Sequence, residues 1–246
     1  MEIIDFQKIS LQDYPDRISS ICYTRGCPLR CPYCHNPSLV LPNLFVEDIQ
    51  NQQGKFMDHL ERRKAMIEGV VISGGEPLIQ NGIAKLLEEI KTLGLSIKID
   101  TNGMYSSKLE ELLAKGLVDY VALDYKGYKE SFYRAIGIKP DEVDYRPYEE
   151  WKKTLNVIEQ SGVSYELRTT IVKEIHALNQ IMAMGEELNR LLPKEKPPWY
   201  LQTYERSEGV LNEITLAEPK ISSYSSEEMK EITKNLTVIF PTIKLR

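Results

Sequence analysis

The sequence has few cysteines, no long apolar run and no excess of positive charge. Four of its 246 residues are cysteine, too few for a disulfide-dense secreted scaffold. No stretch approaches the roughly 20 consecutive apolar residues of a membrane-spanning helix, so we expect no membrane partner. The 31 basic and 36 acidic residues give a net charge of −5, which argues against a nucleic-acid partner. The first ten residues, MEIIDFQKIS, lack the basic start and apolar run of a signal peptide, so we expect a cytoplasmic protein with reduced thiols.

The composition is that of an ordinary globular chain. Hydrophobic residues make up 42% and charged residues 27% of the sequence. No linker or repeat divides it, and its length suits one sizeable core. We expect one domain over residues 1–246, with a core of about 18–205 and a C-terminal extension over 206–246.

Short apolar segments alternate with helical patterns through most of the chain. The segments rich in β-branched and aromatic residues predict strands over 18–24, 69–74, 95–102, 119–125, 164–172 and 199–204. The helical stripes lie in NGIAKLLEEIKTLG, SKLEELLAKG, EEWKKTLNVIEQSG and NQIMAMGEELNRLL. This alternation predicts a parallel sheet with helices outside it, and the pattern alone leaves a barrel and an open sheet as alternatives.

The C-terminal extension has its own signals. Ser225 and Glu228 form a capping box at the start of a helix that would hold Met229, Ile232 and Leu236 on one side. The final TVIFPTIKLR is a candidate for one more strand.

Three of the four cysteines lie within eight positions. Cys27, Cys31 and Cys34 follow the spacing C-x3-C-x2-C in GCPLRCPYCHNP. A structural zinc site normally has four protein ligands, whereas a [4Fe–4S] cluster held by three thiolates keeps one iron open to a substrate. Cys22 or His35 would have to complete a zinc site. Cys22 lies in an apolar strand pattern, where a free cysteine is usually a small core residue, and His35 would form a cramped chelate beside Cys34, so the cluster is favoured.

A second motif, VVISGGEPL (70–78), ends a predicted strand with Gly74, Gly75 and Glu76. Glycines permit a ligand to approach the backbone closely, and a glutamate can accept a hydrogen bond from an ammonium group. The alternative is an ordinary turn at the end of a strand.

Polar residues also end the next two predicted strands. Asp100, Thr101 and Asn102 lie in IDTNG, and Asp124 and Lys126 lie in ALDYKG. Because α/β proteins bind ligands at the carboxyl ends of parallel strands, two adjacent ends of this kind favour a binding site. Turn formation and a solvated lysine are the alternatives.

Arg168 lies in an apolar strand, ELRTTIV (166–172), on one face with Glu166 and Thr170. A cation at such a position needs a partner. We expect that partner to be the carboxylate of a bound cofactor, a loop of a partner protein, or Glu166 in a structural ion pair.

The cysteine motif, with the aromatic Tyr33 before its last cysteine, resembles that of the radical S-adenosylmethionine enzymes. The whole chain looks like an activating protein of glycyl-radical enzymes, and it resembles the longer form of the anaerobic ribonucleoside-triphosphate reductase activating protein. The resemblance is carried, in order, by SLQDYPDRISSICYTRGCPLRCPYCHNPSLV, LERRKAMIEGVVISGGEPL, IDTNG, VALDYKG and YELRTTIV. YCHNP together with the upstream DYP is the most specific part. The family usually has DYPG, and this chain has Asp16 in place of the glycine.

The resemblance implies an α/β fold of the partial (β/α)6 barrel type, with a [4Fe–4S] cluster and S-adenosylmethionine as cofactors. The implied cluster ligands are Cys27, Cys31 and Cys34. The implied contacts of S-adenosylmethionine are Tyr33 at the adenine and Gly74, Gly75 and Glu76 at the amino group, with Asn102 at the neighbouring strand end. Asp100, Thr101 and Asp124 resemble positions that hold a monovalent cation, and Lys126 and Arg168 are candidates for the cofactor carboxylate or the partner loop.

The resemblance also implies a reaction and partners. A flavodoxin or ferredoxin would reduce the cluster, S-adenosylmethionine would be cleaved reductively, and a glycine of a partner enzyme would lose a hydrogen atom. The expected partner of this oxidoreductase is the large chain of anaerobic ribonucleotide reductase. Four cysteines leave no room for a ferredoxin-like module, so the reductase and formate-lyase kinds of activator remain.

Three alternatives remain open at this point. The first is a radical enzyme that acts on a small molecule, resembling 7-carboxy-7-deazaguanine synthase. The second is a pyruvate formate-lyase activating enzyme. The third is no enzyme but a scaffold with zinc held by Cys22, Cys27, Cys31 and Cys34.

The connection over 126–148 and the remaining histidines are less informative. Tyr125, Phe132 and their aromatic neighbours would either form an interface with the partner or pack over one end of the sheet. We expect His59 and His176 at solvated helix or loop positions.

Overall fold

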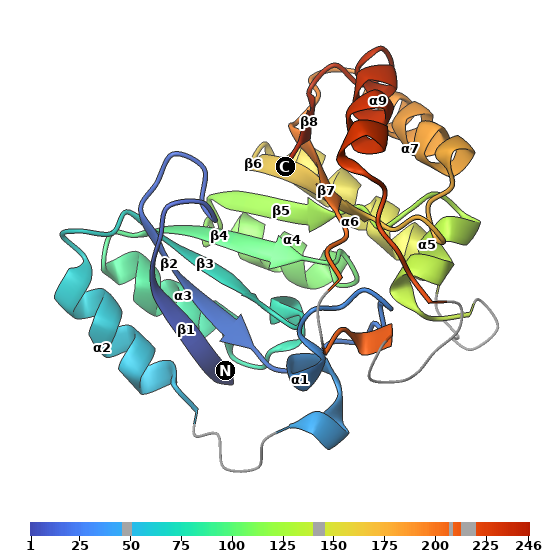
Figure 1. The fold of residues 1–246 in the computed structure, drawn as a ribbon. Coiled ribbons are helices and arrows are strands. Elements are labelled where there is room, and N and C mark those ends of the chain that lie inside the picture. Colours follow the sequence, from blue (N-terminus) through green and yellow to red (C-terminus); the bar gives the residue numbers. More distant parts are fainter. Residues whose placement is uncertain (46–50, 140–145, 207–208, 213–219) are drawn as a thin grey trace. The chain divides into compact units, whose positions relative to one another are not determined.

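The computed structural model has an α/β fold (Figure 1) and describes residues 1–45, 51–139, 146–206, 209–212 and 220–246. The chain forms two compact units. The first unit comprises Met1–Pro28, Ser38–Leu123 and Glu149–Ser164, and the second comprises Leu29–Pro37, Asp124–Tyr148 and Tyr165–Arg246. The prediction of a single domain over 1–246 stays a prediction. Parts of the 126–148 connection and of the 206–246 extension lie outside the described residues.

The first unit is built on strands that are neighbours in chain order. They are β1 (Ile3–Ser10), β2 (Ser19–Thr24), β3 (Gly69–Gly74), β4 (Ser96–Thr101) and β5 (Tyr120–Asp124). β2 to β5 are parallel, and β1 pairs with β2 in the antiparallel sense. The four strands predicted between 18 and 125 are therefore confirmed. β1 was not predicted, because its alternation is weak and its register with β2 is irregular.

Helices connect these parallel strands, as the βα alternation requires. They are α1 (Pro37–Val40), α2 (Gln53–Arg63), α3 (Ile83–Thr92), α4 (Ser106–Ala114) and α6 (Pro147–Ser161), with short 3-10 turns at Pro42–Leu44 and Pro77–Ile79. The predicted stripe of α3 is buried at Ile83, Leu86, Leu87 and Ile90. α2 was not predicted, since it buries only Phe56 and Leu60.

The second unit contains the parallel strands β6 (Ser164–Ile171), β7 (Trp199–Thr203) and β8 (Ile243–Leu245). Its helices are α5 (Glu130–Ile136), α7 (Leu178–Leu191) and α9 (Ser226–Thr237), and Figure 1 shows α7 and α9 side by side. The predicted capping box of α9 is present, because Ser225 accepts from Glu228 N and the Glu228 side chain accepts from Ser225 N. The candidate final strand is confirmed as β8.

Several aromatic residues at this connection belong to the core of the second unit. Tyr125 and Phe132 are fully buried, so the interface interpretation is wrong for these two and the packing alternative holds. The Tyr125 and Tyr148 hydroxyls both donate to the buried carboxylate of Glu187, each at 2.6 Å. Among the described residues, no helix is both long and apolar enough to cross a membrane.

Candidate functional site

Main-chain contacts anchor the cysteine loop in the first unit, just before Cys27. Gly26 N donates to Leu39 O at 2.7 Å, and Gly26 O accepts from Glu76 N at 2.7 Å. At Gly75 a Cβ atom would lie 2.0 Å from Gly26 O, which no side chain tolerates. A glycine is therefore required here because two segments of backbone are in contact. The glycine pair was predicted to let a ligand approach the backbone, and in the structure it lets the backbone of the cysteine loop approach.

Gly74 is constrained in the same way. Its φ is +119°, and a Cβ atom there would lie 2.1 Å from Thr24 N. The end of β3 thus packs directly against the end of β2, from which the cysteine loop departs.

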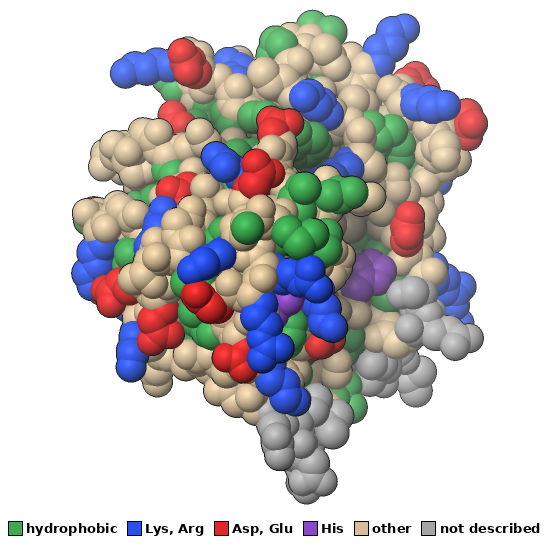
Figure 2. Space-filling model, turned by 90° about the vertical axis from the view of Figure 1, so that its left-hand side faces the viewer, with side chains coloured by type: hydrophobic (Ala, Val, Ile, Leu, Met, Phe, Trp, Pro, Cys, Tyr) green, Lys and Arg blue, Asp and Glu red, His purple; other side chains and the backbone are tan. Residues whose placement is uncertain are grey.

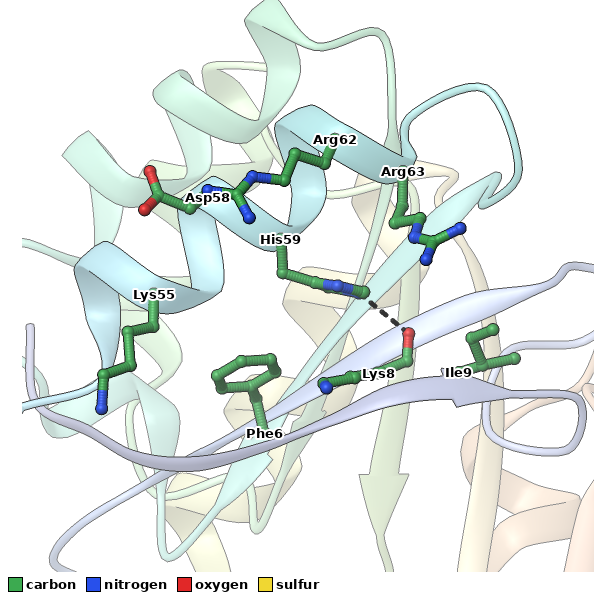
Figure 3. A pocket seen from close by; sticks show the side chains of 8 residues that line it. All are labelled: Phe6, Lys8, Ile9, Lys55, Asp58, His59, Arg62 and Arg63. Atoms are coloured by element: carbon green, nitrogen blue, oxygen red, sulfur yellow. Dashed lines mark hydrogen bonds between the residues drawn. The ribbon is translucent and has the colours of Figure 1, made fainter.

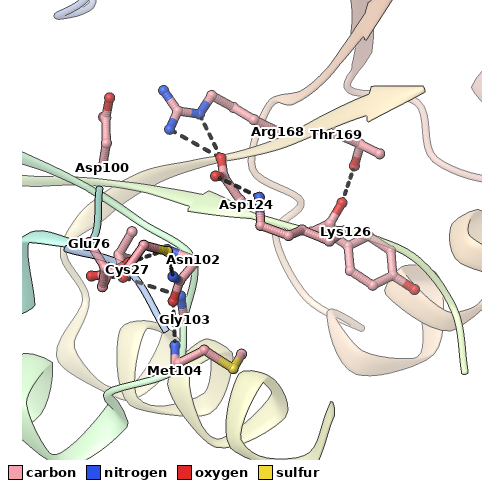
Figure 4. Close-up of polar contacts among 12 residues, drawn as sticks. Cys27, Glu76, Asp100, Asn102, Gly103, Met104, Asp124, Lys126, Arg168 and Thr169 are labelled. Atoms are coloured by element: carbon pink, nitrogen blue, oxygen red, sulfur yellow. Dashed lines mark hydrogen bonds and ion pairs between the residues drawn. The ribbon is translucent and has the colours of Figure 1, made fainter. Parts of the chain in front are cut away.

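Glu76 ties the end of β3 to the end of β4. Its side chain is fully buried. One carboxylate oxygen accepts from Leu78 N at 3.1 Å and from the Thr101 hydroxyl at 2.9 Å. The other accepts from Asn102 N at 2.8 Å (Figure 4). These three donors to the carboxylate are all neutral.

Asn102 connects this group to the cysteine loop, because its Nδ2 atom lies 3.6 Å from the Cys27 sulfur (Figure 4). Its Oδ1 atom accepts from Met104 N at 3.0 Å, which fixes the amide orientation. Within the first unit the structure therefore brings together Cys27, Glu76, Thr101 and Asn102. Of the five residues predicted to gather at strand ends, Thr101 and Asn102 belong to this group.

Asp100 lies apart from this hydrogen-bonded group. It accepts from the Ser73 hydroxyl at 3.2 Å and pairs with Lys98 at 3.5 Å. Lys98 is only 1% exposed and also donates to Asp13 O at 2.5 Å. Lys98 was not predicted as a partner of Asp100, although its position two residues earlier in the same strand places both side chains on one face.

The second unit anchors the later part of the cysteine loop. Arg30 N donates to Ile136 O at 2.8 Å, and a Cβ atom at Gly137 would lie 2.0 Å from Arg30 O. Farther along, Pro32 O accepts from Asn212 N at 2.9 Å and Cys34 O accepts from Leu211 N at 3.1 Å. Cys31 and Cys34 therefore stand on backbone that is held at several points.

Asp124, Lys126 and Arg168 form a charged network in the second unit (Figure 4). Asp124 accepts from Arg168 Nε at 3.1 Å and from Lys126 Nζ at 3.2 Å. Burial opposes the charge on Asp124, but Lys126 and Arg168 outweigh it and hold the pKa of Asp124 below its usual range. Burial likewise opposes the charge on Lys126, yet Asp124 keeps the Lys126 pKa well above its usual value. Arg168 thus has the ionic partner that its apolar strand required, in Asp124.

His176 contacts this network through the main chain of Lys126. The prediction of a solvated position for His176 is wrong. The ring is fully buried. Nδ1 accepts from Val172 N at 3.0 Å, so Nε2 carries the hydrogen and donates to Lys126 O at 2.9 Å. Burial lowers the His176 pKa to about 4, so the ring is neutral. A histidine at this place had no sequence signal, because its acceptor is a main-chain carbonyl 50 residues away.

Tyr33 is 6% exposed and packs in an apolar cluster of the second unit with Ala135, Val172, Ile175, Tyr204 and Val210. The Lys126 ammonium lies 5.9 Å from its ring centroid. Its contact with an adenine stays a prediction.

The thiols divide into two classes. Cys22 is buried in β2, as expected for a core residue, whereas Cys27, Cys31 and Cys34 are partly exposed, and none of the four is in a disulfide. Burial raises the pKa of Cys31 to about 11, although Lys126 opposes this effect. A metal centre would therefore have to displace protons from these thiols as it binds.

The donor set fits an iron–sulfur cluster by its chemistry. Three partly exposed thiols on an anchored loop are the soft ligands that such a cluster takes, and the buried Cys22 is not available as a fourth. Within the described part of the chain, no three His, Cys, Asp or Glu side chains are yet gathered closely enough to hold a metal ion.

Comparison with known proteins agrees with this donor set. The model of the radical SAM superfamily matches residues 21–175. The chain belongs to the radical SAM superfamily. Members of this superfamily use a [4Fe–4S] cluster and S-adenosylmethionine, so the predicted cofactor class is confirmed at the level of the family.

Relatives of this radical SAM protein include activating enzymes. MJ1227 of Methanocaldococcus jannaschii, named for the activation of glycyl-radical enzymes, is 32% identical over 177 residues, which cover 70% of this chain and 68% of that protein. The pyruvate formate-lyase-activating enzyme of Clostridium pasteurianum is 30% identical over 175 residues, which cover 69% and 68% of the two chains.

A solved structure confirms the predicted fold class. Streptococcus suis SuiB, bound to S-adenosylmethionine, aligns with a TM-score of 0.63 at 19% identity over 92% of this radical SAM chain. The alignment covers 49% of SuiB, so the chain spans about half the length of that protein.

Proposed function

We propose that this radical SAM enzyme generates a glycyl radical on a partner enzyme, and that the partner is the large chain of anaerobic ribonucleotide reductase. The observation that carries the proposal is the anchored loop with three partly exposed thiols, in a chain whose relatives include proteins named as activating enzymes. The pairing of YCHNP with the upstream DYP supports an activating protein, and the absence of further cysteines leaves the reductase and formate-lyase kinds. The choice of the reductase rests on the resemblance of the chain to the longer form of its activating protein.

Cys27, Cys31 and Cys34 would hold the cluster. When bound, the cluster and S-adenosylmethionine supply the electron and the carbon radical that removes a hydrogen atom from a glycine of the partner. The chain contributes binding, orientation and exclusion of water, and no protein acid or base is needed for transfer of a hydrogen atom. The electron would come from a flavodoxin or ferredoxin.

Further residues would bind S-adenosylmethionine. The strand ends at Gly74, Gly75 and Glu76 would face its amino group, with Asn102 beside them, and Tyr33 would lie by the adenine. Lys126 and Arg168, the two cations that pair with Asp124, are the candidates for its carboxylate.

The predicted monovalent cation would use Asp100, Thr101 and Asp124. Asp100 already pairs with Lys98, and Asp124 already pairs with Lys126 and Arg168. A metal cation would therefore compete with the protein's own cations at both carboxylates.

The test is activation of the partner. The reconstituted protein, S-adenosylmethionine, a reductant and the reductase large chain are mixed without oxygen, and the electron-spin-resonance doublet of a glycyl radical is recorded. We expect the doublet with the reductase chain and its absence with a reductase whose radical glycine is replaced by alanine. A doublet on pyruvate formate-lyase alone would assign the other partner, and turnover of a small molecule without any protein radical would reject activation.

A further inference from the structure

A basic groove lies in the first unit between β1 and α2, at a place that the proposed chemistry does not use. Figure 3 shows its lining, and the groove encloses about 510 Å³. Four of its eight lining residues are cations, namely Lys8, Lys55, Arg62 and Arg63, and Asp58 is the one acidic residue among them. In a chain of net charge −5 this is a local reversal of sign.

The groove has a fixed floor. The register of β1 with β2 is irregular between Gln7 and Ser10, and there Lys8 O accepts from the Ser20 hydroxyl at 2.6 Å. His59 Nε2 approaches the same carbonyl at 3.0 Å (Figure 3). The His59 ring lies 5.7 Å from the ring of Phe6. The groove therefore keeps its shape although its cationic side chains are exposed.

The cations on α2 lie along one side of the helix. Lys55, Arg62 and Arg63 recur at helical spacing, and no ion pair involves Lys55, Arg62 or Lys8 among the described residues. Lys55 and Arg62 are seven residues apart, which is about 10 Å along a helix. This length matches three to four residues of an extended peptide.

The backbone of β1 is poorly suited to pair with an added strand. The N–H of Phe6 donates to its neighbour Asp5 at 2.8 Å, and Ile9 O accepts from the Gln7 side chain at 2.8 Å. Side chains thus cap groups that an added strand would need. A ligand in the groove would therefore be recognised by charge and apolar contact rather than by main-chain pairing.

An apolar rim continues the basic groove. Ile9, Leu11, Ile18 and Met66 are 49%, 74%, 39% and 55% exposed. Ser10 pairs with Ser19, so Ile9, Leu11 and Ile18 lie near the same end of the β1–β2 pair. The Arg63 guanidinium lies 3.3 Å from the Met66 sulfur. Figure 2 shows hydrophobic and basic side chains grouped together on this face. The β1–α2 surface, as we call it, consists of Lys8, Lys55, Arg62, Arg63, Ile9, Leu11, Ile18 and Met66.

The combination of positive charge and exposed apolar area favours a protein partner over a nucleic acid. Exposed apolar side chains have no counterpart in a phosphate backbone, whereas an acidic protein surface with apolar residues meets both parts of the β1–α2 surface. β1 runs antiparallel to β2, so Ser10 and Ser19 lie at the start of β2 while Cys27 follows its end. An electron donor has to approach the cysteine loop, and this surface lies at the other end of that strand.

We propose that the β1–α2 surface docks an acidic, partly apolar segment of the glycyl-radical enzyme that this chain activates, an inference that rests on the proposed function. A partner large enough to reach both ends of β2 could bind the β1–α2 surface at one end and present its glycine at the cysteine loop at the other. Positive charge on the surface accelerates the encounter, and the apolar rim slows dissociation.

The test measures the dissociation constant of the reconstituted protein with the anaerobic reductase large chain, by biolayer interferometry at low and high salt. The double variant Lys55→Glu/Arg62→Glu is compared with Lys85→Glu/Lys230→Glu, which changes the net charge equally at two exposed lysines on α3 and α9. We expect at least about tenfold weaker binding for the first variant at low salt, less than about twofold for the second, and a weaker salt dependence for the first. Leu11→Gln should weaken binding by about fivefold at both salt concentrations, because apolar contact is not screened.

Equal binding by both double variants would overturn the docking proposal. The proposal would also be overturned if the protein bound a labelled 20-nucleotide RNA more tightly than it bound the reductase chain. It would likewise be overturned if the only effect of Lys55→Glu/Arg62→Glu were the loss of a dimer of this chain. The glycyl-radical doublet separates the two proposals. If the wild-type protein forms the doublet and the double variants bind equally, only the docking proposal fails. If it neither binds the reductase chain nor forms the doublet, the proposed function fails and the docking proposal falls with it.

Discussion

Glu76 in the first unit and Asp124 in the second are both carboxylates at the ends of parallel strands, and the two units stabilise them in opposite ways. Glu76 is fully buried among neutral donors, two backbone N–H groups and one hydroxyl. Asp124 is stabilised by two cations, Lys126 and Arg168. The first carboxylate sets the geometry of strand ends, and the second sets the charge of its surroundings.

The two units also differ in how much a change at these places should cost. Backbone packs on backbone at Gly75, and this arrangement cannot relax around an added atom. The side chains of Lys126 and Arg168 are 14% and 18% exposed, so water can replace part of a lost ion pair. We therefore expect the largest stability effects in the first unit and the clearest pH effects in the second.

The largest effect should come from Gly75→Ala. The added Cβ atom would lie 2.0 Å from Gly26 O, so the end of β3 or the start of the cysteine loop must move. We expect a loss of about 4 kcal/mol or more in the free energy of unfolding, measured by urea denaturation. Gly54→Ala is the matched control, since nothing lies within 4 Å of its added atom, and it should be neutral or slightly stabilising. Equal effects of the two substitutions would contradict the steric account.

Glu76→Ala should be next. It leaves the Thr101 hydroxyl and the backbone N–H groups of Leu78 and Asn102 without their acceptor. We expect a loss of about 3 kcal/mol, because buried donors without partners are costly. Glu76→Gln keeps one acceptor oxygen but turns an amide N–H₂ group toward the other donors, so its cost should be about half as large. If Gln costs as much as Ala, the carboxylate does not act as the acceptor described.

Asp124→Asn should have a smaller effect and one that depends on pH. Because Lys126 and Arg168 lower the Asp124 pKa in the folded state, the carboxylate stabilises the protein above its unfolded pKa of about 3.9, and this contribution is lost as the pH falls through the folded value. We expect the variant to be about 1 kcal/mol less stable than the wild type at pH 7. The difference should shrink as the pH falls below about 4, followed by urea denaturation at several pH values. A difference that does not change with pH would contradict the charged network.

Asp16→Gly should give the smallest effect, and it should be stabilising. Asp16 has a φ of +57°, a left-handed backbone conformation that favours glycine, so the turn forms here at a conformational cost. We expect a gain of about 0.5–1 kcal/mol in the thermal or urea unfolding of the variant. Asp16→Ala retains a Cβ atom and should give no such gain. A gain of equal size for Ala would assign the effect to loss of the charge instead.

Strands β2 to β7 were predictable because each is a short segment rich in β-branched and aromatic residues and bounded by glycine or polar residues. β3 ends at Gly74 as predicted, and α9 begins at the predicted capping box. β1 and α2 gave little signal because they line the basic groove from its two sides, where polar and charged side chains replace the apolar stripe.

The candidate site was predictable in its residues but not in its contacts. The motifs identified Glu76, Asn102 and Asp124 from their positions after strands. No local pattern could show that Glu76 accepts from a strand end 25 residues away, or that His176 supports Lys126 through its carbonyl. Such bonds depend on which strand ends become neighbours, and this is a property of the folded chain.

The account depends most on three thiolates leaving one iron of a cluster open to S-adenosylmethionine. The measurement is electron-spin resonance of the anaerobically reconstituted, reduced protein, recorded before and after addition of S-adenosylmethionine, with iron and zinc determined on the same sample. We predict about four iron atoms per chain, no zinc, and a clear change of the cluster signal when S-adenosylmethionine is added. One zinc per chain, or a cluster signal that S-adenosylmethionine leaves unchanged, would contradict the account.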